Sequence, residues 1–158
     1  YIKNFCSWVP NLNGRITLDV FSNNSTDEVK QFLKDLNNPY INFYEEWIGY
    51  YDLPEVLKNY EVGLILYNGA SLNRIYCAPN KLFEYLAFDL DVWCPLEIKG
   101  VYPYIREYQY PKVLALNFNN LNNINPDDLI NKKNSNYKPS PYFYENVYPK
   151  LKDALVDN

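Results

Sequence analysis

The chain has 158 residues, of which 47% are hydrophobic and 22% are charged, as in ordinary globular domains. Its net charge of −4 argues against general nucleic-acid binding, which needs a basic surface, and the sequence has no apolar run long enough for a transmembrane helix. Because it contains no histidine, His-based acid–base catalysis is excluded within this sequence, and a metal site of the usual zinc kind is not expected.

The first third of the chain predicts two helices and two strands. Apolar residues within 1–11 have the spacing of a helix face that ends at Pro10. Residues 16–21 alternate as a strand, and the polar run 25–28 then opens a helix with one apolar face. Residues 37–39 end that helix, and residues 41–44 form a second, short strand.

The remainder alternates in the same way. A helix is predicted from Asp52 to Tyr60, with Pro54 in its first turn, and the apolar run 62–67 is typical of a buried parallel strand. Residues 68–76 read as a polar loop. The predicted elements that follow are a helix over 79–88, a strand over 92–94, a brief helix over 101–107, a strand over 113–116, an Asn-rich surface loop within 117–136 and a closing helix within 139–157.

Strands that alternate with helices predict an α/β fold, with a Rossmann-like parallel sheet covered by helices on both faces. We expect one domain that spans residues 1–158. Ligands of such sheets bind beyond the carboxyl ends of the strands. In this chain the loops predicted at those ends are 45–51, 68–79 and 95–100.

The start of the predicted helix 79–88 has the chemistry of a nucleotide site. Pro79 leads into a helix that begins with Asn80 and Lys81, and Glu84 follows one turn later. A helix N-terminus offers free backbone N–H groups and a positive dipole, which suit a phosphate. A carboxylate one turn along can accept hydrogen bonds from the paired hydroxyls of a ribose. We therefore expect a diphosphate and a sugar to bind here.

The stretch APNKLFEYLAFDLDVW, residues 78–93, resembles a signature of retaining glycosyltransferases of the GT-B fold, group-1 type. The resemblance extends over roughly residues 12–117, and it implies the C-terminal, donor-binding domain of such an enzyme. The implied reaction transfers a sugar from a nucleotide sugar to a hydroxyl acceptor in polysaccharide or glycan biosynthesis. The donor, a UDP- or GDP-linked sugar, would be a substrate, and neither a cofactor nor a metal is expected.

The resemblance and the helix chemistry together predict a nucleotide-sugar site. Its residues come from the helix start, from the loop before it and from the loop after residue 44, where the family holds the nucleobase. They are Pro79, Asn80, Lys81, Glu84, Arg74, Trp47 and Ile48. The catalytic residues stay unknown, because the first of two acidic residues in that family corresponds to Tyr76 here.

Two alternatives stay open: a nucleotide-sugar 2-epimerase-like domain, and a non-catalytic interaction module with a degenerate site. The module is favoured by Tyr76 and by Asp91, a second negative charge that would repel phosphate unless it points to solvent.

The sequence starts at Tyr1 and has no methionine, so we expect a piece of a two-domain enzyme that is inactive without its N-terminal acceptor-binding domain. Three widely spaced cysteines fit a reducing cytoplasm. Membrane contact is expected only through regions outside this sequence.

Overall fold

The structure is a computed structural model that describes residues 1–129 and 137–156. It divides into two compact units. Unit 1 comprises Tyr1–Val56 and Asn117–Leu129, and unit 2 comprises Leu57–Leu116 and the C-terminal part of the chain. Both units are built from parallel strands and helices, so the predicted α/β class is confirmed at this level.

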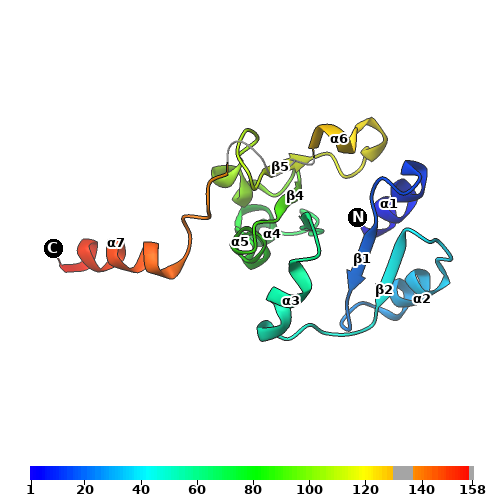
Figure 1. The fold of residues 1–158 in the computed structure, drawn as a ribbon, viewed down its shortest axis with the longest axis horizontal. Helices are drawn as coiled ribbons and strands as arrows, with labels where there is room; N and C mark the ends of the chain where they lie inside the picture. Colours follow the sequence, from blue (N-terminus) through cyan, green and yellow to red (C-terminus); the bar gives the residue numbers. More distant parts are fainter. Residues whose placement is uncertain (130–136, 157–158) are drawn as a thin grey trace. The chain divides into compact units, whose positions relative to one another are not determined.

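Unit 1 contains a two-stranded parallel sheet flanked by short helices (Figure 1). The strands pair in the register Leu18↔Ile41, and the Phe21 and Tyr44 rings stack with centroids 4.6 Å apart. Its elements are α1 (Ile2–Trp8), η1 (Val9–Leu12), β1 (Leu18–Phe21), α2 (Asp27–Asp35), β2 (Ile41–Tyr44), η2 (Tyr50–Asp52), α3 (Leu53–Leu57, which ends at the start of unit 2), η4 (Leu121–Asn123) and α6 (Pro126–Leu129).

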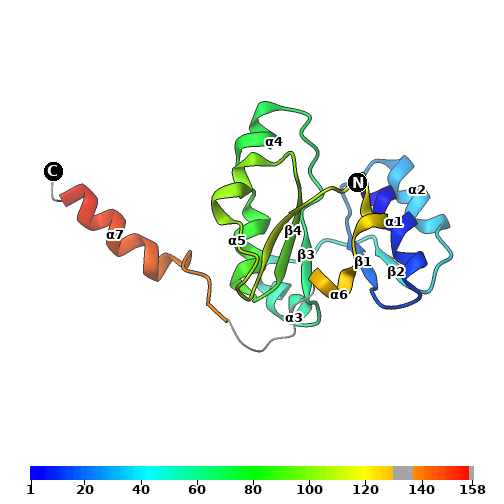
Figure 2. The ribbon, with the colours of Figure 1, turned by 90° about the horizontal axis from the view of Figure 1, so that it is seen from above.

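Unit 2 contains three parallel strands in the order β3-β4-β5, with the register Gly63↔Val92 and Val92↔Val113. Helix α5 lies alongside this sheet (Figure 2). Because parallel neighbours need a crossover connection, α5 returns the chain from the end of β3 to the start of β4. The elements are β3 (Val62–Leu64), α4 (Leu72–Tyr76), α5 (Asn80–Ala87), β4 (Asp91–Pro95), η3 (Lys99–Tyr104), β5 (Val113–Leu116) and α7 (Tyr144–Val156).

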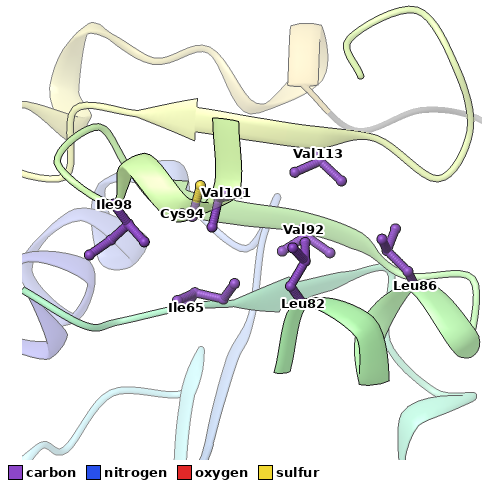
Figure 3. Close-up of a cluster of buried hydrophobic side chains, with 8 residues drawn as sticks. All are labelled: Ile65, Leu82, Leu86, Val92, Cys94, Ile98, Val101 and Val113. Atoms are coloured by element: carbon purple, nitrogen blue, oxygen red, sulfur yellow. The ribbon is translucent and has the colours of Figure 1, made fainter. Parts of the chain in front are cut away.

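The core of unit 2 forms where the apolar face of α5 meets the sheet. Leu82 and Leu86 lie one turn apart on α5 and point toward Val92 of β4 (Figure 3). Both leucines are buried, as the helical spacing of their positions predicts. The other buried members of this cluster are Ile65, Cys94, Ile98, Val101 and Val113.

Gly63 allows α5 to approach the sheet closely. A Cβ at Gly63 would lie 2.2 Å from Cδ2 of Tyr85, which is inside any van der Waals contact. A glycine within a strand often marks such a close approach. The Tyr85 ring therefore covers Gly63, and this contact helps to set how α5 is rotated about its own axis.

The structure corrects several sequence predictions. The five strands form two sheets, of two and three strands, rather than one. The predicted loop 68–76 is wrong in part, because Ser71 accepts a hydrogen bond from the backbone N–H of Arg74 and begins helix α4. The Asn-rich stretch contains η4 and α6, and it buries Phe118 and Leu121; residues 130–136 of that stretch lie outside the described residues.

The buried phenol of Tyr85 should make unit 2 sensitive to alkali. Burial, the Glu84 carboxylate and the Tyr67 phenol raise the pKa of Tyr85 from 10.0 to about 12. The folded state therefore holds this proton more tightly than the unfolded state, so the stabilisation is intact below pH 10 and is lost as the pH rises to about 12. We expect Tyr85 to account for about 2–3 kcal/mol of the fall in unfolding free energy over this range.

Urea denaturation at a series of pH values measures this effect. Tyr85→Phe should flatten the alkaline slope without abolishing it, because burial also raises the pKa of Tyr110 to about 12. Replacement of the exposed Tyr51 by Phe is the control and should leave the wild-type slope. An unchanged slope in Tyr85→Phe would contradict the prediction.

Candidate functional site

The predicted site residues of unit 2 lie around the amino end of α5. Because β3, β4 and β5 are parallel, their carboxyl ends share one edge of the sheet. Helix α5 follows β3 and leads back to the start of β4, so its N-terminus lies at that edge. This is the edge where ligands of open α/β sheets bind.

Helix α5 begins at Asn80, as predicted. Pro79 precedes it with extended backbone, φ −73° and ψ 146°, and no side chain caps the helix. The backbone N–H of Leu82 donates to the Pro79 carbonyl, 3.0 Å away. The N–H groups of Asn80 and Lys81 donate to no acceptor within the described residues, and both side chains are exposed. The helix end therefore presents donors to solvent.

The Lys81 ammonium lies 5.9 Å from the centroid of the Tyr85 ring. An exposed cation–π contact of this kind contributes about 0.5–1 kcal/mol, which offsets the cost of a cation at a helix N-terminus. The position of Lys81 at the helix start therefore has a local explanation in addition to a bound anion. Among the residues that the structure describes, no carboxylate forms an ion pair with Lys81, so its charge is available to a ligand.

Glu84 lies one turn after Asn80 and is half-buried. Its carboxylate is close enough to the Tyr85 phenol to raise the pKa of that phenol. Within the described part of the chain, Glu84 has neither a hydrogen bond nor an ion pair. A carboxylate in this position has its oxygens free to accept hydrogen bonds from a ligand.

Arg74 is exposed on α4, in the connection between β3 and α5. Its Nη1 donates to Oδ1 of Asn68, at 3.0 Å, and this bond orients the guanidinium without neutralising it. Among the described residues no carboxylate lies within ion-pair distance of Arg74. Two cationic groups thus come from neighbouring parts of the chain, Arg74 from the connection between β3 and α5 and Lys81 from the first turn of α5.

Trp47 and Ile48 belong to unit 1, in the loop that follows β2. Trp47 is 72% exposed, so it does not belong to the core of that unit. The start of the loop is held by Glu45, whose carboxylate contacts Lys30 at 2.9 Å and Lys34 at 2.5 Å. Hydrogen bonds from these two lysines lower the pKa of Glu45 to about 2.

The structure corrects the expectation for Asp91. Its side chain does not point to solvent, because it is 1% exposed. It does not lie beside the amino end of α5 either, because it begins β4, which follows the carboxyl end of that helix. The backbone N–H of Lys112 donates to its Oδ1, at 2.6 Å. Helix α5 has eight residues and is therefore about 12 Å long, at 1.5 Å of rise per residue, and Asp91 follows its carboxyl end, away from the helix start. It therefore does not repel an anion there.

Sequence reasoning missed three residues near this edge: Tyr67, Asn68 and Lys99. Tyr67 and Asn68 are the third and fourth residues after β3, and that position was itself a usable signal. Lys99 begins η3 and donates from Nζ to the Tyr102 hydroxyl, at 2.8 Å, and to the Leu96 carbonyl. Tyr76, which stands where the resembled family has an acid, is exposed at the end of α4.

No family model, curated protein or solved structure matches this chain. The resemblance to GT-B glycosyltransferases thus stays a prediction, and function has to be argued from the geometry of α5.

Two kinds of feature are absent from the described residues, a metal-binding group and a membrane-spanning helix. No three His, Cys, Asp or Glu side chains in residues 1–129 and 137–156 come together as a group that could hold a metal ion. Within the same residues, no helix is both long and apolar enough to cross a membrane. All three cysteines are free thiols.

Proposed function

We propose that this chain is the donor-binding part of a glycosyltransferase that transfers a sugar from a nucleotide sugar to a hydroxyl acceptor. The observation that carries the proposal is the start of α5. Free N–H groups, the ammonium of Lys81 and the unpaired carboxylate of Glu84 follow one another along a single helix at the ligand-binding edge of a parallel sheet.

Each group has a distinct role in this proposal. The N–H groups of Asn80 and Lys81, together with the Lys81 and Arg74 cations, bind the diphosphate and stabilise the negative charge that develops as it leaves. Glu84 accepts hydrogen bonds from the ribose hydroxyls. The finer architecture, a Rossmann-like half of a GT-B enzyme whose other domain binds the acceptor in the cytoplasm, belongs to the same proposal.

A second candidate is a non-catalytic module that keeps the fold. The observation in its favour is Tyr76, which has no carboxylate where the resembled family has its first acid. A 2-epimerase-like domain is less well supported, because those enzymes usually depend on histidine and this chain has none.

Calorimetric titration of the chain with UDP, GDP and uridine tests the proposal. We expect Glu84→Ala to weaken UDP or GDP binding at least about ten-fold, since a lost hydrogen bond to a charged group is worth about 1.5–3 kcal/mol. Lys81→Ala should weaken the binding of UDP or GDP but leave the binding of uridine unchanged, because the ammonium contacts only phosphate.

The exposed Glu145 of α7 provides the matched control, and Glu145→Ala should bind as wild type does. Nucleotide binding that survives Glu84→Ala unaltered would contradict the assigned role of Glu84. If neither UDP nor GDP binds, the degenerate module is supported instead.

A further inference from the structure

Three aromatic rings from three separate segments meet beside α5. Phe83 of α5, Tyr104 of η3 and Tyr142 form a closed triangle with centroids 5.2–5.4 Å apart. All three contacts are edge-to-face, with interplanar angles of 90°, 74° and 76°, which is a favoured geometry for aromatic pairs. Phe83 immediately precedes Glu84, so the triangle contacts the helix beside the residue that we propose binds the ribose.

Tyr142 belongs to a segment, residues 137–143, that contacts α5 near both ends of the helix; we call it the strap. The Tyr137 hydroxyl donates to Oδ1 of Asp89, at 3.1 Å, just beyond the C-terminal end of α5. The backbone N–H of Lys138 donates to the Tyr110 carbonyl, at 2.8 Å. The strap then brings Tyr142 onto Phe83, in the first turn of the helix.

The strap also lies near the Arg106 guanidinium, part of which would be more stable in contact with water. Nε and Nη2 of Arg106 are buried and have no hydrogen-bond partner within residues 1–129 and 137–156. Burial lowers the pKa of Arg106, and the nearby Tyr142, Asp91 and Asp89 oppose this shift. Unpaired guanidinium nitrogens favour hydration, so the aromatic contacts have to hold the strap in place against this tendency.

We propose that Tyr142 is a positioning residue that fixes the rotation of α5 about its axis and hence the direction of Glu84. Successive helix residues are separated by about 100° around the axis, so a ring that holds Phe83 also sets where the next side chain points. Leu82 and Leu86 anchor the adjacent side of the helix in the core, and Phe83 packs against the margin of the same cluster. The consequence for ligand binding rests on the proposed nucleotide function.

The experiment compares Tyr142→Ala, Tyr142→Phe and Phe143→Ala with the wild-type chain. Phe143 is the matched control, because it is the adjacent residue, has the same 40% exposure as Tyr142 and makes no ring contact within the described residues. Two quantities are measured: the hydrogen-exchange rates of the α5 and β4 amides without nucleotide, and the Kd for UDP and GDP.

We expect Tyr142→Ala to speed exchange of the α5 amides about ten-fold relative to those of β4, and to raise the nucleotide Kd about five- to ten-fold. Tyr142→Phe keeps the ring and should restore both quantities to within two-fold of wild type, as should Phe143→Ala. If Tyr142→Phe behaves as wild type does, the effect of Tyr142→Ala comes from loss of the ring and not from loss of the hydroxyl.

The role of Tyr142 would be overturned by wild-type α5 exchange in Tyr142→Ala, or by an equal effect of Phe143→Ala. Faster exchange with an unchanged Kd would likewise overturn it. If wild type binds neither UDP nor GDP, the proposed function fails, and the exchange rates alone then decide whether Tyr142 positions the helix.

Discussion

Gly100→Ala should strongly destabilise unit 2. A Cβ at Gly100 would lie 2.4 Å from the carbonyl carbon of Cys77 and 2.6 Å from the carbonyl oxygen of Tyr76. Both neighbours are backbone atoms at the end of α4, so no side chain can rotate away to relieve the overlap. We expect a loss of at least about 3 kcal/mol, at the upper end of the cost of overpacking.

Urea denaturation monitored by tryptophan fluorescence measures this loss. Gly49→Ala is the control, because its Cβ would meet only the carboxylate of Asp52, at 2.7 Å, and that side chain can turn away. The control should change the unfolding free energy by less than about 1 kcal/mol. Equal stabilities of the two variants would mean that η3 does not pack on the end of α4 as described.

Leu82→Ala should cost about 2–5 kcal/mol of unfolding free energy, the usual range for a fully buried leucine. Leu82 is 0% exposed and lies between α5 and the sheet, where its removal leaves a cavity lined by Val92 and its neighbours (Figure 3). The loss should come with reduced order of α5, because this side chain is one of two that anchor the helix on the core.

Thermal and urea unfolding of Leu82→Ala and Leu72→Ala provide the comparison. Leu72 lies on α4 and is 73% exposed, so the same truncation there should cost less than about 0.5 kcal/mol. A Leu82→Ala protein as stable as Leu72→Ala would contradict the packing of α5 on the sheet.

Several features of the fold could be predicted from neighbouring residues in the chain. The helix that begins at Asn80 after Pro79 was predicted correctly, because proline favours the extended backbone that precedes a helix start. The residue after the C-cap of that helix, Asp89, has φ 58°, a left-handed conformation that aspartate visits more readily than most residues. The parallel strands followed from the alternation of strands and helices.

Other features of the candidate site could not be predicted in this way. The sequence places the charge of Asp91 close to the predicted phosphate site. In the structure Asp91 is buried at the start of β4 and accepts a hydrogen bond from the backbone N–H of Lys112. Helix α4 was expected as a loop, because its polar sequence has no apolar periodicity. The local cation–π contact of Lys81 depends on the direction of the Tyr85 ring, which in turn depends on Gly63 of another element.

The amino-acid sequence alone determined the order of the strands and of most of the helices, the start of α5 and the spacing of Asn80, Lys81 and Glu84 along it. These properties depend on backbone preferences and on periodicity over a few residues, which act within one segment. The tertiary structure decided that the strands form two sheets, that Gly63 lies beneath Tyr85, and that Tyr142 contacts Phe83. Those contacts join segments far apart in the chain, and they are set by shape and burial, which no local pattern encodes.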